Sequence, residues 1–320
     1  MKHPKIISQT TGRREFLSKL SAAAALGFIG PVAGSDGTSP VDNSNNLRQS
    51  NTLMPSIALG PYRISRLICG SNPILGYSYL GSHTDRQMKE YFTNERTLEF
   101  LEKCEKAGIS AHQSSSRVEY LSELRRKGSK LKIICLHSDR EKIREAVETA
   151  KPIAMVHHGG VSDRLFASGN SEVVRDYVRA VKDLGLLAGV SAHNPDVIKQ
   201  IADEGWDVDF FMACFYFLTR NEIGNAATLP VGSYHFFRND PEVMTSVIRQ
   251  VEQPCLAFKI LGAGRHCSGQ EQVRNAFRYA FENIKPNDGV IVGMFPWCFD
   301  EIEADVKYVQ ELGTTSSLNR

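Results

Sequence analysis

Residues 187–210 read LAGVSAHNPDVIKQIADEGWDVDF, and this stretch contains a complete strand–helix–strand unit. The short apolar run at 186–190 predicts a buried strand, and the run at 208–213 predicts a second one. Between them, residues 195–205 carry apolar side chains at helical spacing and end on Gly205, a typical helix stop. A helix that joins two buried strands in this way predicts a parallel pair.

The same alternation of strand and helix continues along the chain. Helical patterns separate eight short apolar runs, which we predict as strands at 66–70, 108–112, 132–136, 153–157, 186–190, 208–213, 256–260 and 289–293. Eight such units predict a closed (β/α)8 barrel, the TIM barrel of the α/β class. An open doubly wound sheet is the alternative, but no glycine-rich dinucleotide motif follows the first strand. The segment MPSIALGPYRISRL, residues 54–67, predicts an N-terminal hairpin at the barrel base.

The first residues of the chain have the pattern of a targeting segment. Residues 1–34 resemble a twin-arginine signal peptide, because Arg13 and Arg14 precede a Phe-Leu pair and a weakly hydrophobic stretch at 20–29. We therefore expect the twin-arginine export machinery to carry the protein to the periplasm, with an amphipathic N-terminal helix as the alternative. The apolar stretch is too short to span a bilayer, so we expect the signal to be cleaved and no stable membrane span to remain. The remaining parts are a disordered polar linker at 35–53, the barrel at 54–314 and a tail at 315–320.

The composition is that of an ordinary globular protein. The chain has 38 basic and 36 acidic residues, a formal net charge of +2, and no dense basic stripe. We therefore expect a small-molecule partner and no nucleic acid. The seven cysteines are odd in number, and several lie in or beside apolar runs where a free thiol packs as a small hydrophobic group. The sequence does not predict a disulfide framework.

Four of the predicted strands end in histidine. Their segments are ISAH, KIICLH, IAMVHH and LAGVSAH, which supply His112, His137, His157, His158 and His193. If these strands are neighbours, the imidazoles crowd the carboxyl end of the barrel, where barrel enzymes carry their chemistry. Neutral imidazoles there predict a divalent metal site for zinc, manganese, iron or nickel, and hydrogen-bonded wall residues are the alternative. His157 and His158 are adjacent in one strand, so only one of them should enter the mouth.

Three further residues are candidates for catalysis. Lys259 interrupts an apolar strand, and because an unpaired ammonium group is costly to bury we expect it to reach the mouth, as an electrostatic stabiliser or a Schiff-base lysine. Asp209 opens the sixth strand and is a candidate base, with a hydrogen bond at the barrel floor as the alternative. His235 lies in the long segment 219–238, which predicts a lid over the mouth. We expect Asp209 or His235 to transfer a proton.

Four segments of the chain resemble the aldo/keto reductase-like superfamily, over about residues 55–312. They are LGPYRISRLICGSNPILG, GISAHQSSS, the stretch at 187–210 and GVIVGMFPWCFDEIEADV. The resemblance implies a (β/α)8 barrel with NADP laid over its mouth. The residues that it implies for cofactor binding are Ser191, Asn194, Lys259 and Arg265.

The chain also departs from that family's catalytic pattern. The family pairs a tyrosine with a lysine, an aspartate and a histidine. Here the aspartate position reads His112, the lysine position falls near His137, and only the histidine of the fourth strand is kept, as His157 or His158. A tyrosine with an ordinary pKa near 10 is a poor proton donor without that lysine and aspartate.

Three functions follow from these observations. The first is an exported barrel enzyme, a divalent-metal-dependent lyase, isomerase or hydrolase that acts on a sugar-like hydroxycarbonyl compound. The second is an NADP-linked oxidoreductase of the aldo/keto reductase kind. The third is a non-catalytic barrel that binds a glycan or another small ligand.

Overall fold

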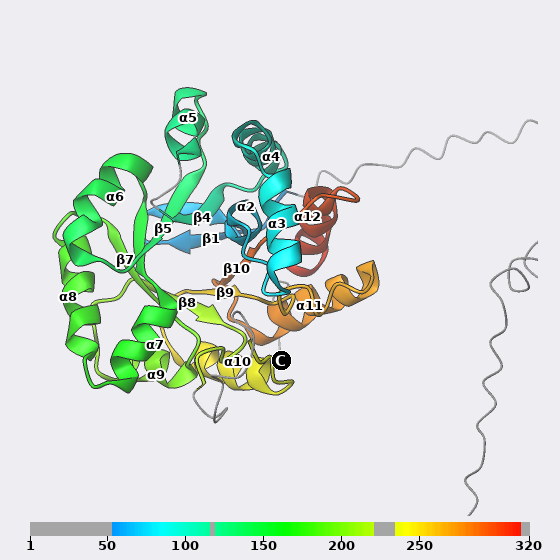
Figure 1. Ribbon diagram of the computed structural model, residues 1–320. Helices are drawn as coiled ribbons and strands as arrows, with labels where there is room; N and C mark the ends of the chain where they lie inside the picture. The colour runs from blue at the N-terminus through cyan, green and yellow to red at the C-terminus, as the bar shows by residue number, and fades with distance from the viewer. Residues whose placement is uncertain (1–52, 116–118, 221–233, 315–320) are drawn as a thin grey trace, which may run out of the picture. The chain divides into compact units, whose positions relative to one another are not determined.

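The computed structural model describes residues 53–115, 119–220 and 234–314, which belong to one compact unit. The predicted signal peptide, nearly all of the linker and the tail lie outside these residues, so export stays a prediction. Eight parallel strands close into a barrel in the order β10-β3-β4-β5-β6-β7-β8-β9 (Figure 1). Their bounds are β3 Leu67–Gly70, β4 Ala111–Ser115, β5 Lys132–His137, β6 Ala154–His157, β7 Leu187–Ala192, β8 Phe210–Cys214, β9 Cys255–Phe258 and β10 Gly289–Val292.

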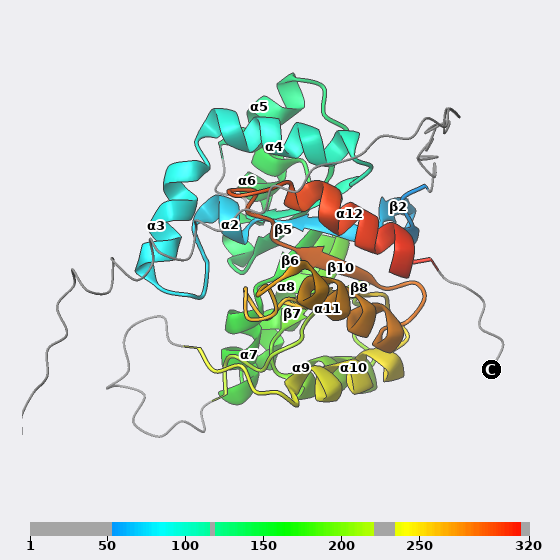
Figure 2. The same ribbon diagram turned by 90° about the vertical axis from the view of Figure 1, so that its right-hand side faces the viewer.

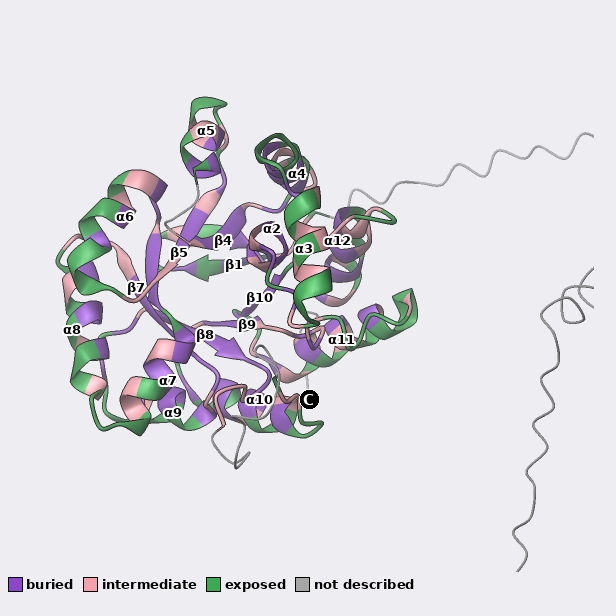
Figure 3. Ribbon diagram, in the orientation of Figure 1, coloured by how far each residue is buried: buried purple, intermediate pink, exposed green. Residues whose placement is uncertain are grey.

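Helices follow the strands along the chain and surround the barrel, with their outer faces exposed and the strands buried (Figure 3). The prediction of a (β/α)8 barrel is therefore confirmed. The helices are α2 Asn72–Leu75, α3 Ser82–Tyr91, α4 Asn94–Lys106, α5 Tyr120–Arg126, the 3₁₀ turn η1 Arg140–Lys142, α6 Ile143–Ala150, α7 Gly159–Ala167, α8 Ser171–Lys182, α9 Pro195–Asp203, α10 Asp240–Gln250, α11 Gln270–Asn283 and α12 Glu301–Leu312. None of the helices in the described ranges is long and apolar enough to cross a membrane.

The predicted hairpin is also confirmed. Strands β1 (Ser56–Leu59) and β2 (Tyr62–Ser65) pair antiparallel around a two-residue turn. Ala58 donates its backbone N–H to Asn287 Oδ1 over 2.9 Å, just before β10 begins, so the hairpin lies at the amino end of the strands. In Figure 2, β2 lies at one end of the barrel and α3 at the other. The hairpin therefore closes the base and leaves the carboxyl end as the mouth.

The barrel has separate inner and outer apolar layers. The inner layer joins the hairpin to alternate strand residues, and its strand members include Ala111, Ala154, Val156 and Phe210. The outer layer consists of the intervening strand residues, such as Met155 and Phe211, which pack against the helices. Because side chains alternate along a strand, this division fixes which residues of each strand face the barrel axis.

Candidate functional site

A cavity of about 310 Å³ opens at the mouth of the barrel. Gly70, Phe258 and Gly293 line it at the ends of β3, β9 and β10. Residues 77–80 and helix α3 cover it, and α12 and the loop that follows β9 form its sides. Such a position is where barrel enzymes bind their substrates, and the volume is at the lower end of the range for small-molecule sites.

Lys259 supplies the positive charge of this cavity wall. It follows β9 directly, and its backbone is left-handed with φ 61°, a conformation that costs a non-glycine residue about 1–3 kcal/mol. Its Nζ lies 4.1 Å from the ring centre of Tyr79 and 5.0 Å from that of Phe258. Tyr79 is left-handed as well, also with φ 61°. Within the described ranges no carboxylate forms an ion pair with Lys259, so the cation is held by aromatic rings and faces the cavity.

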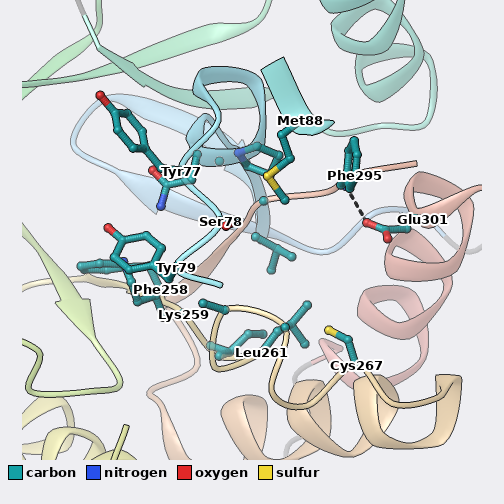
Figure 4. A pocket seen from close by; sticks show the side chains of 18 of the residues that line it. Tyr77, Ser78, Tyr79, Met88, Phe258, Lys259, Leu261, Cys267, Phe295 and Glu301 are labelled. Atoms are coloured by element: carbon teal, nitrogen blue, oxygen red, sulfur yellow. Dashed lines mark hydrogen bonds between the residues drawn. The ribbon is translucent and has the colours of Figure 1, made fainter. Parts of the chain in front are cut away.

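Two carboxyl groups from α12 line the other side of the cavity. Figure 4 shows Tyr79 and Lys259 on one side, and Glu301 with Cys267 on the other. Glu301 accepts a 2.6 Å hydrogen bond from the backbone N–H of Phe295, yet burial raises its pKa from the usual 4.5 to about 7. This pKa suits a group that must both take and return a proton at neutral pH.

Asp305 lies one helical turn beyond Glu301 and is 4% exposed. Burial raises its pKa well above the usual value, and the charge of Glu301 raises it further. The thiol of Cys267 stands near both groups, and burial followed by their negative charges raises its pKa to about 11. At neutral pH the two carboxyl groups on this side of the cavity therefore hold protons more firmly than they would in water.

A second polar group lies beside the cavity, behind Phe258. Asp163 of α7 accepts hydrogen bonds from the backbone N–H and from Nδ1 of His193, the latter over 3.0 Å. The His193 ring centre is 5.8 Å from that of Phe258, and the Nζ of Lys259 lies 5.0 Å from the centre of the same Phe258 ring. Burial lowers the pKa of His193, Asp163 opposes this, and the charge of Lys259 lowers the pKa further. His193 is therefore neutral at pH 7. It packs against Phe258, the residue directly before Lys259.

The five histidines do not form the predicted metal site. Strand alternation turns His112, His137 and His157 outward, because the residues before them, Ala111, Leu136 and Val156, belong to or pack against the inner layer. Of the five histidines, only His158 and His193 are at positions whose side chains face the barrel axis. Among the described residues no group of three or more His, Cys, Asp or Glu side chains is arranged to hold a metal ion. The residues therefore do not fit the predicted ion.

The three outward histidines have structural partners. His112 is fully buried, with Nδ1 2.9 Å from the carbonyl oxygen of Cys69 and Nε2 2.8 Å from the hydroxyl of Tyr120, so neither nitrogen is left for a ligand. His157 Nδ1 is 2.7 Å from Ser162 Oγ, and its ring packs on Tyr177. Because side chains alternate along a strand, the apolar residue before each of these histidines indicates from the sequence that the histidine faces away from the barrel axis.

His137 and His158 complete the set. His137 Nδ1 accepts a hydrogen bond from the backbone N–H of Asp139, outside the barrel wall. His158 is exposed at the mouth but does not line the cavity. Desolvation by the surrounding protein lowers the pKa of His158, and the neighbouring His193 and Lys259 lower it further. It is a neutral imidazole at the rim of the site.

The prediction that Asp209 transfers protons at the mouth is wrong. Asp209 precedes β8, so it lies at the amino end of the strands, and the floor hydrogen bond is the correct alternative. Its Oδ1 accepts from Lys182 Nζ over 2.8 Å and its Oδ2 from the backbone N–H of Ala188 over 2.7 Å. This carboxylate fastens the start of β7 to α8 at the base of the barrel.

The residues implied for NADP are mostly engaged elsewhere. Ser191 is 2% exposed, and Asn194 Oδ1 caps α9 by accepting from the backbone N–H of Asp196. The guanidinium of Arg265 stacks 3.7 Å from the ring centre of Phe236 and donates to the carbonyl of Gly262. Of this set only Lys259 lines the cavity, and NADP binding stays a prediction.

The predicted lid lies largely outside the described residues, which omit 221–233. Of its described part, His235 stacks on Phe237 with ring centres 6.2 Å apart and does not line the cavity. His235 is therefore not part of the site in the described structure.

The sequence interpretation missed Glu301 and Asp305. It assigned the stretch FDEIEADV to an ordinary amphipathic helix, whose acidic residues are normally exposed. One signal was available: Asp305 falls within the buried stripe of α12, which contains Ile302, Val306 and Val309. A carboxyl group in the apolar face of a helix is a candidate for function, because burial without a partner is costly.

Comparisons with known proteins agree on the fold alone. No family model and no curated protein sequence matches this chain. An aldo-keto reductase from Bacillus halodurans, in its apo form, is similar in structure with a TM-score of 0.50 and 12% identity, over 82% of this chain and 93% of that one. A glycerol dehydrogenase from Gluconobacter oxydans has a TM-score of 0.48 and 11% sequence identity, over 80% of this chain and 95% of that one. The former similarity supports the TIM-barrel fold that the sequence resemblance implies.

Proposed function

We propose that this chain is an enzyme that moves a proton on a small hydroxycarbonyl compound bound in the cavity, as an isomerase or a lyase. The observation that supports this best is that Lys259, without a carboxylate partner in the described structure, and Glu301, with a pKa of about 7, line one cavity of about 310 Å³. A ligand that fills this space contacts both groups. It can therefore have its carbonyl oxygen held on one side and a C–H bond presented to a base on the other.

Each residue has a defined task in such a reaction. Lys259 donates a hydrogen bond to the carbonyl oxygen and stabilises the negative charge that develops there. Ionised Glu301 removes a proton from the adjacent carbon, the C–H electron pair forms a carbon–carbon double bond, and the carbonyl electron pair moves to the oxygen beside Lys259. Protonated Glu301 can return the proton to the same carbon, which exchanges or inverts that centre. In an isomerase it returns the proton to the former carbonyl carbon, while the proton of the adjacent hydroxyl group moves to the oxygen beside Lys259 and the carbonyl group forms at the former hydroxyl carbon. In a lyase it gives the proton to a hydroxyl group on the next carbon, which leaves as water as the enolate electron pair re-forms the carbonyl group and the new carbon–carbon double bond. No oxidant or reductant is needed.

The size and lining of the cavity favour this over the NADP-linked alternative. A volume of about 310 Å³ is at the lower end for small-molecule sites, so a dinucleotide would extend beyond it. Arg265, which the family resemblance implies for the cofactor, is stacked on Phe236 instead. Aromatic and aliphatic side chains dominate the lining, so the surroundings of the reacting groups are largely apolar.

Hydrogen exchange at carbon tests the proposal without knowledge of the product. The protein is incubated in D₂O with a panel of aldoses, ketoses, amino sugars and hydroxylated 2-oxo acids, and deuterium next to the carbonyl is measured by NMR. We expect enzyme-dependent exchange in at least one compound. Lys259→Met should slow it by about 10²-fold or more, as is usual when a group that stabilises an oxyanion is lost.

Lys182→Met is the matched control, because this lysine pairs with Asp209 at the barrel base, away from the cavity. It should exchange the same compound at the wild-type rate. Absence of exchange throughout the panel, or a Lys259→Met variant as fast as the wild type, would overturn the proposal.

A further inference from the structure

Asp305 is a buried acid without a partner in the described structure. It is 4% exposed, it lines the cavity, and no hydrogen bond or ion pair joins it to another described side chain. Buried carboxyl groups in folded proteins are normally hydrogen-bonded or paired with a cation, because the unpaired charge is costly to desolvate. The carboxyl oxygens of Asp305 can therefore accept hydrogen bonds from a ligand that enters the cavity.

Among the described residues, no cation forms an ion pair with Asp305 or Glu301; the nearby Lys103 pairs with Asp300 instead. Glu301 lies one turn away and receives only the backbone N–H of Phe295 among the described residues. The other titratable groups that the charge of Asp305 reaches are Cys104 and Cys267, whose pKa values are raised chiefly by burial, and Tyr308. All three are uncharged at neutral pH. Two acids thus share an apolar end of the cavity with no positive partner among the described residues.

Two aromatic side chains also line the cavity. Figure 4 shows Phe295 next to Glu301, and Phe299, two residues before Glu301, is the other. Aromatic faces attract cations, and they do so most strongly where water is excluded. Two carboxyl groups with aromatic neighbours make a site that fits an ammonium group better than a hydroxyl group.

We infer that the α12 end of the cavity is a subsite for a primary ammonium group, so that the ligand is an amino-substituted hydroxycarbonyl compound. This rests on the proposed function for the carbonyl end, while the ammonium subsite can be tested by itself. The ammonium group donates hydrogen bonds to Asp305 and Glu301, and its charge favours their ionised forms. A carboxyl group that is protonated before binding therefore releases its proton as the cation binds.

Two probes of equal length separate charge from apolar burial. n-Pentylamine and n-pentanol are titrated into the full chain, with binding followed by ligand-detected NMR. We expect the amine to bind about tenfold or more tightly than the alcohol, as a hydrogen bond to a charged group contributes about 1.5–3 kcal/mol. Asp305→Asn should remove that preference, whereas Asp209→Asn, the same change at the barrel base, should retain it.

A second measurement uses the wild type alone and does not depend on whether Asp305→Asn folds. Calorimetric titration near pH 7 in two buffers of different ionisation enthalpy should show proton release with n-pentylamine and none with n-pentanol. Equal affinities for the two probes, or an undiminished preference in Asp305→Asn, would overturn the subsite.

The two proposals fail separately. Lys259→Met should leave the amine preference intact, because that residue lies on the other side of the cavity. If the wild type shows no carbon exchange with any compound of the panel but still prefers the amine to the alcohol, the reaction is refuted and the subsite is kept.

Discussion

The partly buried carboxyl group of Glu301 predicts that this protein loses stability as the pH rises toward neutrality. Its pKa is about 7 in the folded chain, against the usual value of 4.5 once unfolded. Between these two values the folded protein holds a proton that the unfolded chain has released. The contribution of the neutral acid is therefore fully present below pH 4.5 and is lost as the pH passes through about 7.

The size of the effect follows from the same pKa values. A rise from 4.5 to about 7 corresponds to about 3 kcal/mol of unfolding free energy, which is a ceiling because the site relaxes when the charge forms. Glu301→Gln keeps an oxygen to accept the N–H of Phe295 but cannot ionise. We expect this variant to be more stable than the wild type above about pH 7, by about 1–3 kcal/mol, and to lack this part of the pH dependence.

Urea unfolding measured at intervals from pH 4.5 to about 8 provides the test. Glu303→Gln is the control, because it removes a charge from an exposed position on the same helix. Its profile should run parallel to that of the wild type. The reasoning is refuted if the Glu301→Gln profile is also parallel, since burial would then not hold the proton on this carboxyl.

Two further changes probe the wall and the base of the barrel. Gly159→Ala would place a methyl carbon 2.9 Å from Ser191 Oγ and 3.2 Å from Cε1 of His193, so we expect a cost of about 1–3 kcal/mol in urea unfolding and altered imidazole NMR signals of His193. Unchanged signals would show that the wall adapts without moving this ring. Asp209→Asn weakens the contact with Lys182, and we expect a loss of about 1 kcal/mol with no change in the carbon-exchange rate. A slower exchange rate would contradict its place at the base.

The barrel and its hairpin were predictable because they depend on local patterns. Apolar runs of strand length, helical spacing between them and glycine at helix ends are features of short windows. Their eightfold repetition leaves few topologies, and right-handed crossovers between parallel strands leave fewer. Lys259 was predictable in the same way, as a charge within an apolar strand.

The metal prediction failed on a detail that is also local. Histidines at similar points of neighbouring strands need not share a face, because one residue of offset turns a side chain to the other side of the sheet. His112, His137 and His157 are each one step from an inward residue, so they pack against helices or loops outside the barrel wall.

By itself the sequence determined a (β/α)8 barrel, the hairpin that closes its base and a lysine at the end of the seventh barrel strand. Only the tertiary structure decided that Glu301 and Asp305 share a cavity with Lys259, some forty residues earlier in the chain. The physical reason is that a pKa and a vacant hydrogen-bonding capacity depend on everything within a few ångströms in space. Sequence periodicity reports which face of an element is buried, and closure of the barrel determines which buried faces meet.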